Sequence, residues 1–166
     1  PDWQQQLEIE SPWTVNFQAG RGAPETMVFE SLQSLSENSE ASIKYFSGVT
    51  TYKNEFTLGG VNAQSALLDL GRVGDVAEVF VNGEYSGTAW RQPYKVDIGK
   101  QLKSGINNLE IRVANLWVNR LIGDRQPNAE SISYTTFNTY VPQAPLRVSG
   151  LIGPVRLFMI EPIAQE

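Results

Sequence analysis

The sequence predicts an all-β fold, an antiparallel two-sheet β-sandwich of jelly-roll type with at most one short helix. Three observations predict it. Short apolar segments alternate with polar residues, Gly- and Asn-containing turn signals separate them, and only one segment is compatible with a helix. A chain of 166 residues is long enough to enclose a single core. We therefore expect one domain over residues 11–166, preceded by a linker remnant over residues 1–10.

The N-terminal part of the domain contains one clear strand and the only helix candidate. Trp13, Val15 and Phe17 alternate with polar residues, which is typical of a half-buried strand. Residues 18–24 contain two Gly and one Pro and predict a loop. Residues 29–38 are the segment in which we expect a short helix.

From residue 42 onward the pattern is that of strands joined by turns. Strands are expected within residues 43–58, 67–70, 76–81, 84–88, 94–98, 109–114 and 155–160. Asn82-Gly83 predicts a two-residue hairpin turn, because both residues tolerate the positive φ that such a turn requires. In the strand over residues 109–114, the odd-numbered side chains should face the core and the even-numbered ones the solvent. Trp117 continues the odd-numbered set, so we expect it in the core.

The segment over residues 118–145 has no clean periodicity and is long for a connection within a compact domain. Its polar and aromatic side chains suit sugar contacts, because aromatic rings stack on pyranose rings while amides and carboxylates hydrogen-bond hydroxyl groups. With the region after residue 89, it supplies the candidate residues for substrate binding or for a domain interface. These are Trp90, Arg91, Tyr94, Asn119, Arg120, Asp124, Arg125 and Tyr134.

Each candidate also has a structural interpretation. Trp90 can close the end of the sandwich instead of stacking on a sugar. Asp124 can pair with Arg120 or Arg125 and so order the long segment, since a segment of this length needs such ties.

Composition excludes several classes of function. The chain has no histidine and no cysteine, which removes the serine and cysteine triads, thiolate metal sites and most zinc sites. The net charge of −5 and the absence of a basic run predict no nucleic-acid partner. No apolar run is long enough to span a membrane. The chain opens with Pro1 and shows no signal peptide, so we expect it to be a piece of a longer protein.

Catalysis by the chain itself is not expected. Glycoside hydrolysis needs two carboxylates about 5–10 Å apart, one with a raised pKa. The candidates lie in no signature and fall mostly at turns or on exposed strand faces: Asp69, Asp75, Asp97, Glu110, Asp124 and Glu130. We expect no catalytic residue, no cofactor and no metal ligand. A structural calcium ion is the alternative, although no D-x-D-x-[DN]-G cluster is present.

Several motifs follow one another in a fixed order along the chain. They are L-x-L-G (Leu68–Gly71), A-x-V-x-V-N-G (Ala77–Gly83), G-x-x-W (Gly87–Trp90), Y-x-x-D-I (Tyr94–Ile98), L-x-x-G-x-N-x-L-x-I-x-V (Leu102–Val113) and S-G-x-x-G-x-V-x-L (Ser149–Leu157). The series resembles the sugar-binding, galactose-binding-like β-sandwich of family 2-type glycoside hydrolases. The segments Ile43–Phe56 and Asn115–Asp124 look closer still to the C-terminal sandwich of family 106-type α-L-rhamnosidases. Leu35 departs from this pattern, which has a Trp before the Ser-Glu pair.

The resemblance implies a non-catalytic accessory domain of a larger glycoside hydrolase. Such a domain packs on the catalytic domain of the same polypeptide and can lend a loop to carbohydrate binding, and Asp124 occupies a comparable place in its loop. The parent protein would then be a rhamnosidase that cleaves O-glycosyl bonds, in a secreted or periplasmic location. The alternatives are an autonomous carbohydrate-binding module and a self-contained glycosidase.

Overall fold

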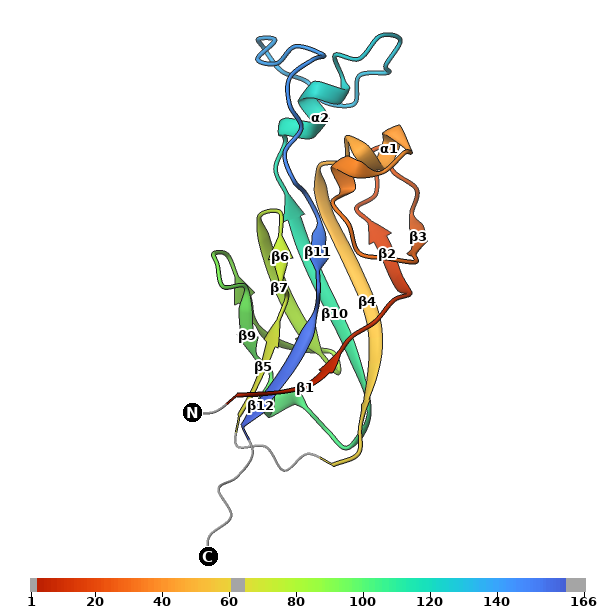
Figure 1. The fold of residues 1–166 in the computed structure, drawn as a ribbon. Coiled ribbons are helices and arrows are strands. Elements are labelled where there is room, and N and C mark those ends of the chain that lie inside the picture. The colour runs from red at the N-terminus through yellow and green to blue at the C-terminus, as the bar shows by residue number, and fades with distance from the viewer. Residues whose placement is uncertain (1–2, 61–64, 161–166) are drawn as a thin grey trace, which may run out of the picture.

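The computed structural model describes residues 3–60 and 65–160, which form two antiparallel sheets around one core (Figure 1). The six-stranded sheet has the order β3 (Thr26–Phe29), β2 (Trp13–Phe17), β4 (Gly48–Leu58), β10 (Gly105–Asn115), β7 (Val76–Val81), β8 (Glu84–Ala89). The four-stranded sheet has the order β1 (Gln4–Glu8), β12 (Arg156–Ile160), β5 (Ser65–Asp69), β9 (Lys95–Asp97). A short pair, β6 (Arg72–Val73) and β11 (Leu151–Gly153), accompanies them. The predicted all-β sandwich is confirmed.

Strands β4 and β10 form the centre of the larger sheet. They pair along their whole length, and Ile111 lies opposite Tyr52 on one side and Val79 on the other. Ile111, Tyr52 and Val79 are all fully buried, because directly opposed residues on paired strands point to the same face of the sheet. Glu110 and Arg112 lie on the outer face, as the alternation predicted.

Tyr52 links the larger sheet to the chain that returns through β11. Its hydroxyl oxygen accepts a hydrogen bond of 3.2 Å from the Leu151 N–H. Burial raises the pKa of Tyr52 to about 12, so this side chain is a neutral structural element. Gly150 makes the approach possible, because a Cβ atom at this position would lie 2.5 Å from the Tyr52 hydroxyl oxygen.

The Asn82-Gly83 turn is confirmed, with φ of 53° and 83° at the two residues. Asn82 does more than tolerate this backbone. Its side-chain amide donates to the Gln101 carbonyl oxygen at 2.8 Å, and its Oδ1 accepts from the Asn108 N–H at 3.0 Å. The turn is therefore fastened to the start of β10.

The helices differ from the sequence prediction. No α-helix forms over residues 29–38, where Phe29 closes β3 and only a 3-10 turn, η1 (Leu35–Glu37), is present. The two short α-helices among the described residues are α1 (Ala41–Lys44) and α2 (Val118–Gly123), and a second 3-10 turn is η2 (Gly99–Gln101). In the α1 region, Ile43 and Phe46 are three residues apart and both fully buried, which matches one face of a helical turn better than a strand.

Residues 1–10, predicted as a linker remnant, include a strand of the sandwich. β1 pairs with β12 along the edge of the four-stranded sheet, and Ile9 is buried in the core. Backbone pairing holds this edge strand while its Gln side chains stay exposed, so it has little apolar signature. Residues 61–64 and 161–166 of the predicted domain lie outside the described residues. No helix in the described part of the chain is long and apolar enough to cross a membrane.

Candidate functional site

Residues 118–145, here called the distal segment, project beyond the ends of β4 and β10 (Figure 1, teal to blue at the top). The segment begins with α2, directly after β10 ends at Asn115. The chain then has no further helix or strand before β11 among the described residues. The long irregular connection that the sequence indicated is therefore present, but its first turn is helical.

A buried ion pair organises the distal segment from within. Arg120 and Asp124 are four residues apart at the end of α2, and their Nε and Oδ1 atoms are 2.8 Å apart. The side chains are only 6% and 2% exposed. Asp124 also accepts hydrogen bonds from the Ile132 N–H at 3.2 Å, from the Ser133 N–H at 2.8 Å and from the Ser133 hydroxyl.

These contacts set the charge state of Asp124. Burial alone pushes its pKa up, but the hydrogen bonds from Ser133 and Ile132 and the charge of Arg120 outweigh burial. The pKa of Asp124 therefore lies below its ordinary value of 3.8. A carboxylate that stays ionised and is enclosed by four donors holds the chain in place, and it is not suited to act as a general acid.

A second set of polar contacts ties the base of the distal segment to the chain that returns to β11. The Asn119 side-chain amide donates to the Arg147 carbonyl oxygen at 2.7 Å, and the Arg147 N–H donates to Asn119 Oδ1 at 2.8 Å. One level below, Asn115 Oδ1 accepts from the Gly150 N–H at 2.7 Å. Each asparagine side chain thus bonds backbone groups that a neighbouring strand would otherwise bond, at the point where the sheet ends.

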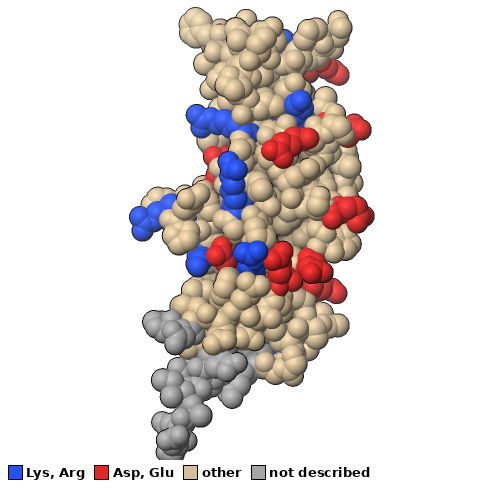
Figure 2. Space-filling model, in the orientation of Figure 1, with Lys and Arg blue, Asp and Glu red and all other residues tan. Residues whose placement is uncertain are grey.

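Above this fixed base the distal segment exposes several large apolar side chains among polar ones. Tyr134 is 92% exposed and Phe137 is 80% exposed, with Ile132 and Val141 beside them in the sequence and also exposed. In Figure 2 the upper end of the molecule shows few charged side chains, while Lys, Arg, Asp and Glu gather around the middle of the sandwich.

The expectation that Trp117 lies in the core is wrong. Its side chain is 47% exposed, and the Arg21 guanidinium lies 4.5 Å from its ring centroid. The strand parity fails because β10 ends at Asn115 and Trp117 takes a helical backbone as the N-cap of α2.

The predicted site residues form two groups rather than one. Asn119, Arg120 and Asp124 lie buried at the base of the distal segment, Arg125 is half-buried next to them, and Tyr134 is at the exposed surface. The other three predicted residues, Trp90, Arg91 and Tyr94, follow β8. β8 and β10 both run antiparallel to β7, so the two groups belong to the same end of the sheet, with β7 between them.

The group that follows β8 has one exposed aromatic side chain. Trp90 is 65% exposed, and the Arg91 guanidinium lies 5.1 Å from its ring centroid. Tyr94 instead packs half-buried against the core, and its carbonyl oxygen accepts from the Leu70 N–H at 2.8 Å.

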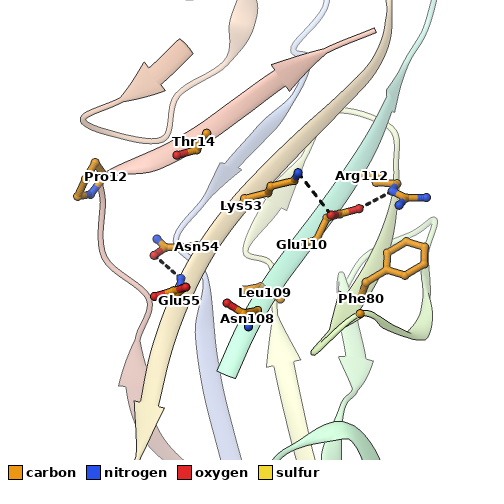
Figure 3. Close-up of a pocket in the computed structure, with 11 residues that line it drawn as sticks. Pro12, Thr14, Lys53, Asn54, Glu55, Phe80, Asn108, Leu109, Glu110 and Arg112 are labelled. Atoms are coloured by element: carbon orange, nitrogen blue, oxygen red, sulfur yellow. Dashed lines mark hydrogen bonds and ion pairs between the residues drawn. The ribbon is translucent and has the colours of Figure 1, made fainter. Parts of the chain in front are cut away.

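Sequence reasoning missed a groove on the outer face of the six-stranded sheet (Figure 3). It has a volume of about 700 Å³ and crosses β2, β4, β10 and the β7–β8 hairpin. Lys53, Glu110 and Arg112 line it, together with Phe80. Outward alternation on β4 and β10 could have marked these side chains, but which of them become neighbours depends on the cross-strand register.

Most carboxylates considered for catalysis have structural partners. Asp69 Oδ1 accepts from the Gly71 N–H at 2.9 Å, and Asp69 Oδ2 lies 3.3 Å from Lys95 Nζ. Asp97 accepts from the Gly99 N–H at 2.9 Å. Asp75 accepts from the Leu116 N–H at 3.2 Å. Within residues 3–60 and 65–160, no group of three or more Asp, Glu, His or Cys side chains is placed to hold a metal ion.

Comparison with known proteins identifies the type of domain. A rhamnosidase from Novosphingobium sp. PP1Y superposes with a TM-score of 0.93 and 50% identity, over 95% of this chain and 15% of that one. A GH2 beta-galacturonidase from Eisenbergiella tayi superposes with a TM-score of 0.62 and 19% identity, over 95% of this chain and 24% of that one. At this level of identity, the similarity to the beta-galacturonidase shows a shared fold only.

A protein of Formosa agariphila described as "Putative beta-glucuronidase" is 33% identical over 92% of this chain. The chain spans only 16% of that protein's length. No family model matches the sequence. This chain thus matches only a small part of each of these longer proteins. The chain is a β-sandwich domain similar to one in a rhamnosidase, and it shares the fold of a domain in a family 2 glycoside hydrolase.

Proposed function

We propose that the chain is a non-catalytic accessory domain of a larger glycoside hydrolase, and that its distal segment packs on the catalytic domain. The observation that carries this proposal is the exposure of Tyr134 and Phe137, 92% and 80%, on a segment whose base is rigidly fastened. Large aromatic side chains grouped at one exposed end of a domain mark an interaction surface.

The fastening of the base supports docking. Arg120, Asp124 and Asn119 make the contacts that order the segment, so these residues position the docking surface and do not touch a ligand themselves. An ordered loop loses less conformational entropy on binding than a mobile one. A long connection that is tied down in this way is a typical means of presenting a surface.

The structural partners of the described carboxylates Asp69, Asp75 and Asp97 support the non-catalytic role. The chain has no histidine, and Asp124 has a lowered rather than a raised pKa. The longer relatives, one described as a rhamnosidase and one as "Putative beta-glucuronidase", have ample length for a separate catalytic domain. By this similarity the parent protein cleaves O-glycosyl bonds, with rhamnosides as the first substrates to test. A secreted or periplasmic location is part of the proposal.

Hydrogen exchange tests the docking surface. The amides of residues 134–141, beyond the two that Asp124 holds, should exchange rapidly in the 166-residue chain and slowly in the full-length enzyme that contains it. In the full-length enzyme, Tyr134→Ser combined with Phe137→Ser should restore rapid exchange. Tyr85→Ser is the matched control, because Tyr85 is also exposed, at 53%, but lies on β8. Equal exchange in the isolated chain and in the full-length enzyme would refute docking.

Activity assays test the non-catalytic role. The 166-residue chain should not hydrolyse nitrophenyl rhamnosides or galactosides, whereas the full-length enzyme should hydrolyse at least one glycoside. Turnover by the chain that disappears on substitution of a single carboxylate would make it a self-contained glycosidase.

A further inference from the structure

The groove on the outer face of the six-stranded sheet is separate from the distal segment and carries an inference of its own. Its lining residues come from β2, β4, β10, the β7–β8 hairpin and Pro12, which directly precedes β2. A second hollow of about 670 Å³ adjoins it and shares Lys53, Glu110 and Arg112. These three side chains therefore stand in the middle of one extended, open depression.

The three central side chains are held in a fixed arrangement (Figure 3). Glu110 Oε1 accepts a hydrogen bond of 2.6 Å from Arg112 Nε, and Glu110 Oε2 lies 3.9 Å from Lys53 Nζ. The Arg112 guanidinium also lies over the Phe80 ring, 4.2 Å from its centroid. Contact with both a carboxylate and a ring restricts the rotamers of Arg112, so its remaining N–H donors keep their positions.

The chemistry of the groove matches a neutral polyhydroxyl ligand. The charged lining residues of the first hollow are balanced, with Lys53 and Arg112 against Glu55 and Glu110, and the second hollow adds only Glu25. A polyanion would meet two carboxylates and a polycation two cations, so neither is complementary. A sugar hydroxyl both donates and accepts, and adjacent hydroxyls can therefore bridge a carboxylate and the cation next to it.

Another protein surface is a poorer occupant. The centre of a stable protein interface is depleted in charged side chains and enriched in large apolar ones. Here the centre is a Lys-Glu-Arg row, each member 27% to 51% exposed. We propose that this groove binds a neutral oligosaccharide across the strands, with Glu110 as acceptor and Lys53 and Arg112 as donors. Each hollow has the volume of a typical small-ligand site, about 300–1,000 Å³.

Nuclear magnetic resonance titration tests the proposal on the isotope-labelled 166-residue chain. The neutral probes are the tetrasaccharides of glucose, galactose, mannose and xylose, and tetragalacturonate is the acidic probe. At least one neutral probe should shift the amide signals of Lys53, Glu110 and Arg112 and leave those of the distal segment in place. Glu110→Gln and Lys53→Met should each weaken the affinity by about ten- to a hundredfold, because each removes a charge-assisted hydrogen bond to the ligand.

The controls use matched ion pairs on the other sheet. Glu8→Gln and Lys95→Met also remove one member of an exposed pair, Glu8 with Arg156 and Lys95 with Asp69, and should bind the probe as tightly as the unchanged chain. Surface pairs contribute little to stability, so all four variants should unfold at nearly the same temperature.

Four results would overturn the proposal. One is that no neutral probe shifts the groove signals. Another is that Glu110→Gln and Lys53→Met bind as tightly as the control variants. The third is that light scattering shows a dimer that Glu110→Gln dissolves, which would assign the groove to a second copy of the chain. Binding of tetragalacturonate alone would equally contradict the charge argument.

Discussion

Arg120 and Asp124 form an ion pair that is buried at the base of the distal segment, with Nε and Oδ1 2.8 Å apart. Asp124 also accepts hydrogen bonds from the backbone N–H groups of Ile132 and Ser133, eight and nine residues further along the chain. The pair thus connects α2 to the exposed part of the segment. Of the two interpretations that the sequence allowed for Asp124, the structural one accounts for its contacts, with Arg120 and not Arg125 as the partner.

Asp124→Ala should therefore destabilise the chain itself. Removing one member of a buried pair leaves the other charge unpaired, and the free energy of unfolding should fall by about 3 kcal/mol. Urea denaturation measures this loss, and exchange of the Ile132 and Ser133 amides reports whether the segment loosens. Glu130→Ala is the control, because Glu130 is an exposed carboxylate of the same segment. Unchanged stability together with unchanged exchange would contradict the structural role.

Because of the Asp124 carboxylate, the stability of the chain should decrease at acidic pH. The pKa of Asp124 is lowered in the folded chain from its ordinary value of 3.8, so the folded state favours the ionised form. The resulting stabilisation is complete above the unfolded-state pKa and is lost as the pH falls through the folded-state pKa. Between about pH 6 and pH 3, a range that brackets this pKa, the free energy of unfolding should fall less steeply in Asp124→Asn than in the unchanged chain. Parallel curves would count against this contribution.

The buried strand faces predict large losses from small truncations. Val79 and Ile111 are fully buried and oppose each other on β7 and β10. Val79→Ala and Ile111→Ala should each lower the free energy of unfolding by roughly 2–4 kcal/mol through lost burial and a cavity. Val28→Ala is the control, since Val28 is 56% exposed. Changes below about 0.5 kcal/mol at Val79 and Ile111 would be incompatible with this packing.

A substitution at Gly83 tests backbone strain in the β7–β8 hairpin separately from side-chain crowding. Gly83 has φ of 83°, and nothing lies within 4 Å of a Cβ atom placed on it. Gly83→Val should thus lose more than about 1 kcal/mol through backbone strain alone. Gly59→Val, at a turn position that is equally open but without positive φ, should have a much smaller effect on the denaturation midpoint. Equal effects at the two positions would rule out strain as the cause.

Much of the fold was predictable because alternation, turn residues and length are local. The strands over 76–81 and 109–114, the turn at 82–83 and the closing strand all follow from patterns of a few residues. β1 was not found, because backbone pairing with β12 holds it and its side chains stay exposed. The position of Trp117 could not be derived either, because it depends on where β10 gives way to α2.

The long 118–145 segment was predictable, but the burial of its polar side chains was not. The length of the 118–145 segment marked it out, and Asn119, Arg120 and Asp124 were identified as members of a polar cluster. The structure shows these three residues buried and bonded to neighbouring groups, and burial of a loop residue depends on how the chain folds over it. The Lys53-Glu110-Arg112 row was missed for a related reason, because Lys53 and Glu110 are brought together by pairing of residues far apart in the sequence.

The last prediction concerns the close contact between α2 and Tyr45, the C-cap residue of α1. A Cβ atom at Gly123 would lie 2.5 Å from the Cβ of Tyr45 and 2.5 Å from Arg120 Nη2. No real Cβ contact is that short, so Gly123→Ala must push α2 away from Tyr45 or displace the Arg120 side chain from Asp124. Overpacking of this kind should lower the free energy of unfolding by about 1–3 kcal/mol.

The exchange pattern distinguishes this effect from a general loss of stability. In Gly123→Ala, the Ile132 and Ser133 amides should exchange faster than in the unchanged chain, because they depend on the position of Asp124. Gly59→Ala provides the control, since a Cβ atom there meets nothing within 4 Å. If Gly123→Ala were as stable as Gly59→Ala and equally protected at residues 132 and 133, the close contact between α2 and Tyr45 would not be what fixes the distal segment. Faster exchange restricted to the distal segment, with β10 amides unaffected, would show that α2 transmits the position of Tyr45 to the surface that we propose to dock.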